Sequence, residues 1–430
     1  MGTNLTEISS ITRLSVADDG TEGNNSSSTP AISADGRFVA FSSNADNLVP
    51  GDTNTNNSSD IFVRDLLTGT ITLVSVAEDG TQGGTSSFSS TPSISADGRF
   101  VAFYSFANNL VPGDTNNNSD IFVRDLQTGT TTRVSVADDG TQGNNFSSSP
   151  SISADGRFVA FSSNANNLVP GDTNNNSDIF VRDLQTGTTT LVSVADDSIQ
   201  GGTSSFSSNP SISADGRFVA FTSSANNLVA GDTNNNSDIF VRDLQTGTTT
   251  RVSVAEDGTQ GNRSSSSPSI SADGRFVAFE SSAYNLVPRD TNNSSDIFVR
   301  DLLTGSLTRV SVAEDGTQGN NFSSGPSISA DGRFVAFSSN ASNLVAGDTN
   351  NSSDIFVRDL QTGTTTLVSV ADDNIQGGIF TSSSTPSISA NGNFVAFSST
   401  AFNLVAGDTN NSSDIFLATL TGVDSTTSII

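Results

Sequence analysis

Short apolar runs separated by polar turns repeat along the whole chain. In residues 158–194, an apolar run at 158–161 follows an Asp-Gly turn, a second occupies 179–184, and a third occupies 188–194 after a Gln-Thr-Gly turn. A tight Asp-Gly turn next to such runs is typical of β-hairpins. No stretch shows a sustained 3.6-residue period, so we expect an all-β chain with helices nearly absent.

The same order of segments recurs seven times. Each copy holds four predicted strands, A to D, with the sequences Ser-Ile-Ser, Phe-Val-Ala-Phe, Asp-Ile-Phe-Val and Thr-Thr-Leu-Val-Ser-Val. Four short strands in a repeat of this length are typical of propeller blades rather than solenoid coils. The turn between strands A and B places its acidic residue at Asp35, Asp97, Asp155, Asp215, Asp273 and Asp331, with Asn391 in the seventh copy.

The ends of the chain predict how the ring closes. The first D segment, residues 11–17, precedes every A, B or C segment, and the seventh C segment, 414–417, is followed by no D segment. We therefore expect a seven-bladed β-propeller of four-stranded blades over 7–421, with the strand at 11–17 completing blade 7 and a tail at 422–430. The blades are expected to start near residues 30, 92, 150, 210, 268, 326 and 386.

The repeat SADGRFVAF, DIFVRDLQTG, TTTLVSV resembles the TolB-like propeller repeat, also called the PD40 or WD40-like repeat, in all seven copies. The resemblance implies a propeller that serves as a partner-binding scaffold or as an accessory domain of peptidases and surface proteins. The connection between strands B and C is much longer here than the brief turn usual in the family. What TolB's own partners recognise therefore does not carry over.

Composition narrows the chemistry. The chain has 18 basic residues, all of them Arg, against 45 acidic residues, and it contains no His, Cys, Lys or Trp. A Ser-His-Asp triad, a Cys nucleophile, a zinc site and a disulfide are therefore excluded. The net charge of −27 argues against nucleic acid as a partner. No apolar run approaches a membrane span. We expect no signal peptide in this chain, yet an exported or cell-surface monomer rather than a cytoplasmic one.

Strand alternation decides which loops share a face. The A–B and C–D turns lie on one face, and the long B–C and D–A connections lie on the other. Long loops on a rigid scaffold are where binding sites usually lie. This long-loop face is predicted to be acidic, because each B–C loop carries an Asp, strand C opens with another, and the D–A connections add pairs such as Asp138-Asp139 and Glu256-Asp257.

The B–C loops hold a candidate calcium motif. In Asp172-Thr-Asn174-Asn-Asn176-Ser-Asp178, oxygen-bearing side chains occupy positions 1, 3, 5 and 7, the spacing of EF-hand-type loops. The Gly and Glu that complete an EF-hand loop are missing, so we expect weak binding, with an Asx turn that caps its own backbone as the alternative. The predicted ligands are Asp114, Asn116, Asn118, Asp120, Asp172, Asn174, Asn176, Asp178, Asp232, Asn234, Asn236, Asp238, Asp290, Asn292, Asp296, Asp348, Asn350, Asp354, Asp408, Asn410 and Asp414.

The aromatic residues divide into two groups. Of the 28 Phe residues, three per blade lie in strands B and C and are predicted to form the core. The others, together with Tyr284, are candidates for stacking on a sugar or contacting a partner, with packing between loops as the alternative. They are Phe88, Phe106, Phe146, Phe206, Phe322, Phe380 and Phe402.

Repetition also bears on function. Catalysis needs one place where an acid and a base lie in different environments, and here each charged position recurs six or seven times. We therefore expect no enzymatic activity. The chain is predicted to be a binding scaffold that engages a protein or a surface polysaccharide through its acidic long-loop face, with calcium as its cofactor. The alternatives are a glycan-binding lectin, a carboxylate-pair glycosidase or lyase, and an amplified or designed ring without an evolved ligand.

Overall fold

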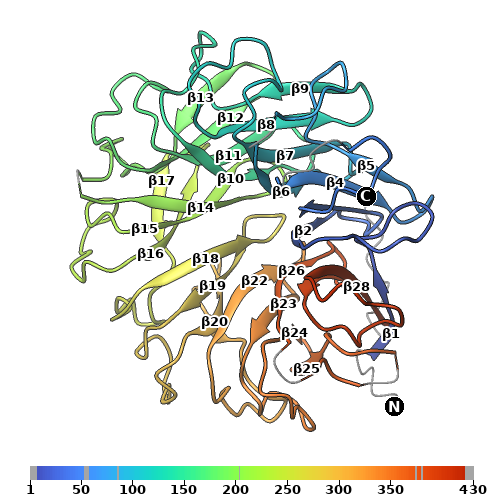
Figure 1. Ribbon diagram of the computed structural model, residues 1–430. Helices are drawn as coiled ribbons and strands as arrows, with labels where there is room; N and C mark the ends of the chain where they lie inside the picture. Colours follow the sequence, from blue (N-terminus) through green and yellow to red (C-terminus); the bar gives the residue numbers. More distant parts are fainter. Residues whose placement is uncertain are drawn as a thin grey trace.

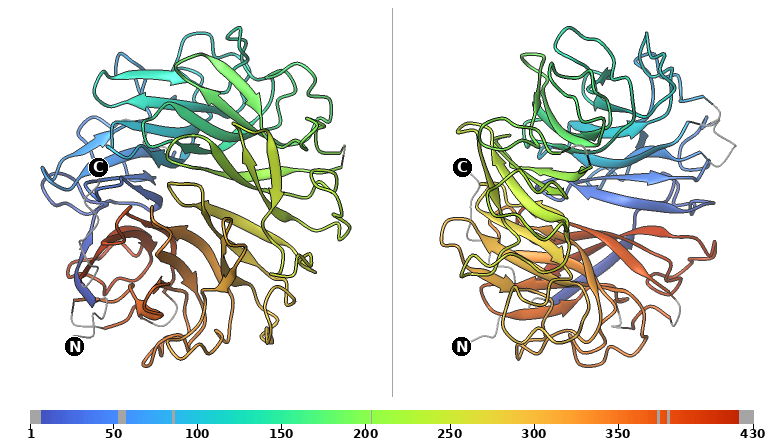
Figure 2. Two further views of the ribbon diagram at one scale, coloured as in Figure 1. Left: turned by 180° about the vertical axis from the view of Figure 1, so that it is seen from behind. Right: turned by 90° about the vertical axis from the view of Figure 1, so that its left-hand side faces the viewer.

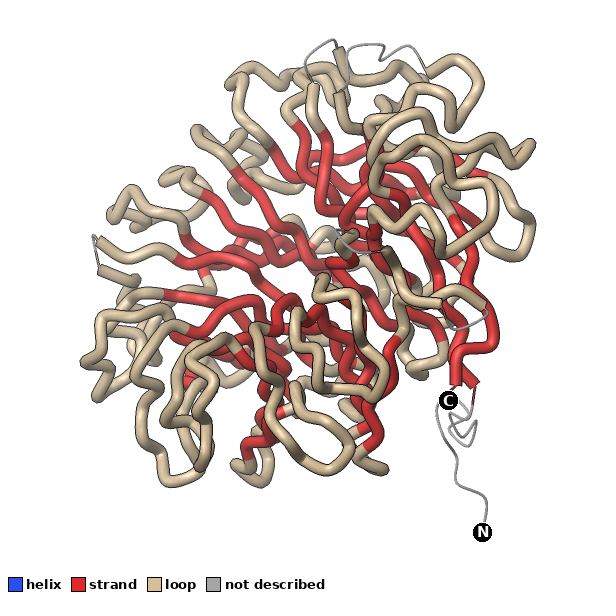
Figure 3. The backbone as a smooth tube through the Cα atoms, turned by 60° about the horizontal axis from the view of Figure 1, so that its bottom comes forward, coloured by secondary structure: helices blue, strands red, loops and turns tan. Residues whose placement is uncertain are grey.

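Seven four-stranded antiparallel sheets stand around a central axis, as Figure 1 and the tube in Figure 3 show. The computed structural model describes residues 7–52, 58–84, 87–202, 204–372, 375–378 and 381–421. These residues form strands and turns without any helix, so none of them belongs to a helix able to cross a membrane. The predicted seven-bladed, all-β propeller is confirmed. The predicted tail at 422–430 lies outside the described residues.

Each of blades 1 to 6 is a meander of four consecutive strands, and blade 7 combines the last three strands with the first. In Figure 1, strand A of each blade lies nearest the axis. The strands, blade by blade from A to D, are β2 Ser27–Ile32, β3 Phe38–Ser43, β4 Asp60–Asp65, β5 Ile71–Leu73; β6 Ser89–Ile94, β7 Phe100–Ser105, β8 Asp120–Asp125, β9 Thr130–Arg133; β10 Ser147–Ile152, β11 Phe158–Ser163, β12 Asp178–Asp183, β13 Thr188–Leu191; β14 Ser207–Ile212, β15 Phe218–Ser223, β16 Asp238–Asp243, β17 Thr248–Arg251; β18 Ser265–Ile270, β19 Phe276–Ser281, β20 Asp296–Asp301, β21 Leu307–Arg309; β22 Ser323–Ile328, β23 Phe334–Ser339, β24 Asp354–Asp359, β25 Thr364–Leu367; and β26 Ser383–Ile388, β27 Phe394–Ser399, β28 Asp414–Thr421, β1 Glu7–Arg13.

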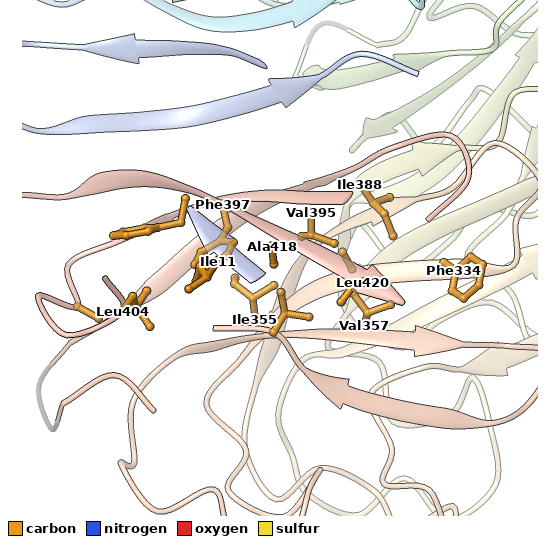
Figure 4. Close-up of a cluster of buried hydrophobic side chains, with 14 residues drawn as sticks. Ile11, Phe334, Ile355, Val357, Ile388, Val395, Phe397, Leu404, Ala418 and Leu420 are labelled. Atoms are coloured by element: carbon orange, nitrogen blue, oxygen red, sulfur yellow. The ribbon is translucent and has the colours of Figure 1, made fainter. Parts of the chain in front are cut away.

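The first strand closes the ring. β1 pairs antiparallel with β28, from Glu7 opposite Thr421 to Arg13 opposite Phe416. The blue β1 lies against the red strands of blade 7 in Figure 1 and in the left view of Figure 2. Figure 4 shows Ile11 packed among the side chains of that blade. The predicted closure is therefore confirmed, although the strand spans Glu7–Arg13 rather than 11–17.

Strand D is shorter than predicted in the other blades as well. In blade 3 it ends at Leu191, before the Val-Ser-Val segment that was expected to extend it. The hydroxyl of Ser193 donates to Oδ1 of Asp178 at 2.7 Å and accepts from the backbone N–H of Ile179 at 3.0 Å. The segment after strand D thus folds over the first residues of strand C, because its serine hydroxyl replaces a regular ladder bond.

A ring of backbone hydrogen bonds links all seven blades next to the A–B turns. The N–H of Ala34 donates to the carbonyl of Ala96 at 3.1 Å, and each following blade repeats the contact until Ala390 donates to Ala34 at 3.1 Å. Since the last bond returns to Ala34, the hydrogen bonds form a continuous ring through all seven blades. An open spiral would lack the bond between Ala390 and Ala34.

Seven hydrophobic clusters fill the spaces between consecutive blades. Between blades 2 and 3, for example, Ile121 of β8 packs with Val159 and Phe161 of β11. Phe161 stacks on Phe180 of the adjacent strand with 5.8 Å between ring centroids, and every blade has the equivalent pair. Two of the three predicted core Phe residues per blade are therefore fully buried. The third, such as Phe158, is partly buried in six blades, whereas Phe334 of blade 6 is fully buried.

Bidentate ion pairs stabilise the face opposite the long loops. This face is formed by the A–B and C–D turns and is here named the short-loop face. Arg157 in the A–B turn of blade 3 donates from Nε and Nη2 to the two carboxylate oxygens of Asp183 at 2.9 and 2.7 Å. The guanidinium also lies 4.7 Å from the ring centroid of Phe158. Blades 1 to 6 share the ion pair, whereas blade 7 has Asn393 and Thr419 in its place.

Arg157→Gln is expected to lower the free energy of unfolding at neutral pH and to matter less in acid. Hydrogen bonds from Arg157 hold the pKa of Asp183 well below its usual range. A carboxyl whose pKa is lowered by folding stabilises the protein above its unfolded pKa of about 3.9, and this contribution is lost as the pH falls below that value. Urea unfolding of both proteins at neutral pH and near pH 3 measures the effect. An equal difference at both pH values would contradict the ion-pair explanation.

Candidate functional site: carboxylate clusters in the long loops

The B–C loop of blade 3 folds into an Asx turn beside the D–A connection. Oδ1 of Asn174 accepts a hydrogen bond from the backbone N–H of Asn176 at 2.8 Å, and its Nδ2 donates to the carbonyl of Gly201 at 3.2 Å. The side-chain amide of Asn176 instead donates to the carbonyl of Gly202 at 3.4 Å. Position 3 of the predicted motif thus serves the turn, and position 5 binds the D–A connection, as Asn118 and Asn236 also do.

A glutamine joins the two aspartates of the loop. Nε2 of Gln200 donates to Oδ1 of Asp172 at 2.7 Å and to Oδ2 of Asp178 at 2.8 Å. The exposed fractions of Asp172 and Asp178 are 8% and 2%. We name this group of Asp172, Asn174, Asp178 and Gln200, with its equivalents in the other blades, the carboxylate cluster. The glutamine was not predicted from the B–C motif, although a Gln precedes Gly in each D–A connection except the first.

The last residue of strand D divides the blades into two kinds. It is Arg in blades 2, 4, 5 and 7 and Leu in blades 1, 3 and 6. Nη1 of Arg251 lies 3.4 Å from Oδ1 of Asp232, and Nη1 of Arg309 lies 3.8 Å from both Asp290 and Asp296. Leu191 occupies the same register in blade 3, opposite the strand C phenylalanine. Sequence analysis also missed this difference, which is visible as TTTR against TTTL.

Burial makes these carboxylates costly to ionise. It raises the pKa of Asp120 in blade 2 and of Asp178 in blade 3 above the usual value. In blade 6, where strand D ends in Leu367, burial raises the pKa of Asp354 to about 6. Taking a carboxylate out of water disfavours its charged form unless a cation or hydrogen-bond donors compensate. The clusters are therefore places where a positive charge is stabilising.

Blade 7 carries a third carboxylate. Glu22 stands where the other D–A connections have Gln, and its oxygens lie within 4.8 Å of those of Asp408 and Asp414. Nη1 of Arg13 lies 2.6 Å from Glu22, 3.6 Å from Asp408 and 3.8 Å from Asp414. Burial and the Asp414 charge raise the pKa of Asp408, whereas hydrogen bonds from Thr409 and the Arg13 charge outweigh burial and lower the pKa of Glu22. Sequence analysis missed Glu22 as well.

The aromatic residues of the loops in blades 2 to 7 adjoin the inner strands, whereas the carboxylate clusters adjoin strand C. They precede strand A or follow strand B, the two inner strands of a blade, whereas the clusters lie at the start of strand C. Phe106 and Phe146 from neighbouring blades lie 6.1 Å apart, so the rings do pack between loops. Large parts of them still face solvent, with exposed fractions of 40% for Phe88 and Phe106, 48% for Phe146, 49% for Phe206 and Tyr284, 46% for Phe322 and 56% for Phe402. Phe380 lies outside the described residues.

The first acid of five D–A pairs forms a hydrogen bond with the next blade. Oδ1 of Asp138 accepts a hydrogen bond at 2.7 Å from the backbone N–H of Thr189, in the outermost strand of the following blade. Asp18, Asp196 and Asp372 make the same contact, and Glu256 reaches Leu307 at 3.2 Å. These carboxylates therefore occupy donors of exposed strand edges, which limits edge-to-edge pairing with other chains. They are not free for a ligand in the way that the sequence suggested.

Known proteins share this fold at low sequence identity. No protein-family model and no curated protein matches the sequence. An oligogalacturonate lyase solved with manganese is 13% identical, with a TM-score of 0.53 over 97% of this chain and 96% of that one. The β-propeller domain of the Trilobed protease from Pyrococcus furiosus is 12% identical, with a TM-score of 0.54 over 92% and 95%; its topology is described as open velcro, whereas β1 closes this ring.

TolB from Acinetobacter baumannii is also similar, at 16% identity and a TM-score of 0.41, covering 79% of this chain. The chain spans 62% of the length of that TolB. The TolB-like resemblance is confirmed for the fold, because the structure is the seven-bladed ring that the repeat implies.

The expectation that this chain has no enzymatic activity is wrong as an inference from repetition. Solved structures with a similar propeller include the oligogalacturonate lyase and the propeller domain of the Trilobed protease, so a ring of this kind occurs in enzymes and does not exclude catalysis. The premise behind the expectation also fails in blade 7. There Glu22 and Asp408 have pKa values shifted in opposite directions, which is the asymmetry that the sequence was thought to lack.

Proposed function

We propose that this ring is a binding scaffold that engages a protein or a surface polymer through its long-loop face, with weak calcium sites in its B–C loops. The observation that carries the proposal is the arrangement of side chains on one face. Half-exposed aromatic rings of blades 2 to 7 adjoin the inner strands, and buried carboxylates lie farther out, at the start of strand C. Aromatic anchors near the centre of a surface, with polar groups around them, are typical of protein interfaces.

The charge of the chain indicates the chemistry of the partner. With a net charge of −27 and 18 Arg residues engaged largely on the short-loop face and between blades, the ring attracts basic surfaces. The partner best suited to this face is therefore a protein segment with basic residues around an apolar or aromatic group. Repetition of the face over seven blades allows several weak contacts to act together.

Replacing Phe106 and Phe146 by Ser is expected to weaken peptide binding at least tenfold without lowering the melting temperature, since both side chains are about half exposed. Random peptides displayed on phage are selected on the wild-type ring, and each selected peptide is titrated against the variant. The matched control is Leu67→Ser with Leu303→Ser. These side chains are 75% and 76% exposed in C–D turns of the short-loop face.

The outcome separates the alternatives. Selected peptides should be rich in Arg or Lys and should bind the Leu67→Ser, Leu303→Ser control like the wild type. Peptides that bind the Phe106→Ser, Phe146→Ser variant equally well would contradict the proposal. A glycan array that gives binding sensitive to the same two Phe residues, with no peptide selected, would assign the face to a sugar polymer instead.

A further inference from the structure

The seven carboxylate clusters form a natural series that differs mainly at the last residue of strand D, and in blade 7 also at Glu22. Each has an Asp in the B–C loop and an Asp at the start of strand C, and the blades differ in whether strand D ends in Arg or Leu. The inference drawn from this series rests on the calcium binding proposed above and assigns it to particular blades.

In blades 2, 4, 5 and 7, where strand D ends in Arg, the guanidinium of that residue supplies a positive charge to the cluster. Nη1 of Arg309 lies 3.8 Å from Oδ1 of Asp290 and 3.8 Å from Oδ2 of Asp296, between the two carboxylates. Arg13 places its Nη1 between Asp408 and Asp414 in the same way. One guanidinium nitrogen therefore marks the point in the cluster where a positive charge interacts with both acids.

In blade 6 the same point has no internal cation. Leu367 takes the place of the Arg, and among the described residues no salt bridge reaches Asp348 or Asp354. Gln376 donates to Asp348 at 3.3 Å, and Oδ2 of Asp354 accepts no hydrogen bond from any described residue. Asp354 is only 2% exposed. A cation or a hydrogen-bond donor placed at this buried oxygen would stabilise its charge.

Blade 3 has the same pair of acids without an Arg. Asp172 and Asp178 share the amide of Gln200, and Leu191 ends strand D. A hollow of about 700 Å³ lined by Asn174, Leu191 and Gln200 lies next to the cluster. Blade 1 also ends strand D in Leu, but residues 53–57 of its B–C loop lie outside the described residues.

We propose that blades 3 and 6 each bind one Ca²⁺ between their two aspartates, at the place that the Arg guanidinium takes in blades 2, 4, 5 and 7, which bind none. Every available ligand is a carboxylate, amide or backbone oxygen, the donor set that Ca²⁺ prefers. In a blade whose strand D ends in Arg, one guanidinium partly neutralises the two aspartates. In blades 3 and 6, the two carboxylates have no such cation, so a divalent ion can neutralise them. In blade 7 the third carboxylate, Glu22, is held by Arg13 at 2.6 Å.

Calorimetric titration of the chelator-treated full chain with CaCl₂ tests the assignment by counting sites. Leu191→Arg with Leu367→Arg is expected to bind two Ca²⁺ fewer than the wild type, because the new guanidinium groups fill both clusters. Arg251→Leu is expected to bind one more. The control is Leu67→Arg with Leu303→Arg, which adds the same charge at exposed C–D turns and should leave the count unchanged.

Each result decides the matter. An unchanged count in the Leu191→Arg, Leu367→Arg protein, with calcium bound by the wild type, would overturn the blade assignment and leave the general calcium proposal standing. No calcium bound by the wild type would overturn both, without touching partner binding through the Phe residues. If the Arg variant fails to fold by circular dichroism, Asp178→Asn with Asp354→Asn removes the same charges, and it must lose two sites.

Discussion

A chain that begins at Asp18, and therefore lacks β1, is expected to lose cooperative folding. The truncation leaves blade 7 with three strands and exposes the ladder edge of β28. It also removes Ile11, 6% exposed, from the core between blades 6 and 7, and Leu14, 1% exposed, from the core between blades 7 and 1. Losing one buried aliphatic side chain costs about 2 to 5 kcal/mol, and whole domains are stable by only about 5 to 15 kcal/mol.

Thermal unfolding by circular dichroism and the oligomeric state by light scattering measure the effect. We expect a broad, early transition and aggregation through the open edge. The control is a circular permutant in which an Asn-Gly turn joins Thr421 to Glu7, with new ends between Asn24 and Asn25. Because Glu7 pairs with Thr421, this link makes a hairpin of β28 and β1 and should retain the wild-type melting temperature. A truncated chain that melts like the wild type would show that the closure adds little.

This dependence on β1 could be predicted from the sequence because it follows from counting segments. Seven copies of each strand pattern, with one D segment displaced to the front, leave a closed ring as the only arrangement without an exposed edge. Strand bounds were harder to predict. The Val-Ser-Val segment has strand-like composition, yet the hydroxyl of Ser193 binds Asp178 and turns the chain over strand C. A local pattern cannot show such a contact, since its partner comes from another strand.

The candidate site, too, could be predicted only in part from the sequence. The B–C motif correctly indicated that Asp172 and Asp178 lie together, because they share one short loop. Gln200 and the Arg or Leu at the end of strand D enter the cluster from segments more than ten residues away, and only the fold brings them there. Both residues stand at fixed positions of the repeat, so they are visible when the seven copies are aligned. Comparing the copies position by position, rather than reading one motif, would have found them.

Gly156→Ala is expected to be among the most destabilising single substitutions outside the buried core. Gly156 lies in the A–B turn of blade 3 with φ at 75°, and an added Cβ would lie 2.2 Å from Cδ2 and 2.6 Å from Cγ of Phe100 in blade 2. That ring cannot move away easily, because the guanidinium of Arg99 lies 4.7 Å from its centroid and is itself paired with Asp125. A backbone at positive φ costs an L-residue about 1 to 2 kcal/mol, and overpacking adds about 1 to 3 kcal/mol.

Gly140→Ala separates these two costs. Gly140 has a φ of 83°, but its added Cβ would meet no atom within 4 Å. We therefore expect a loss of about 1 kcal/mol in the free energy of unfolding for Gly140→Ala and about 3 to 4 kcal/mol for Gly156→Ala. Urea unfolding at neutral pH gives both values. Equal losses would mean that the contact between Gly156 and Phe100 is not tight.

A double variant tests the contact itself. Phe100→Leu shortens the ring that faces Gly156, so Gly156→Ala should cost less in its presence than in the wild type. The same contact joins every pair of neighbouring blades, from Phe38 against Gly98 to Phe394 against Gly36 across the closure. The contact between a phenylalanine and a glycine therefore fixes how closely each blade can approach the next. If Phe100→Leu fails to relieve Gly156→Ala, the spacing of the blades must instead be set by the adjacent ring of alanine hydrogen bonds.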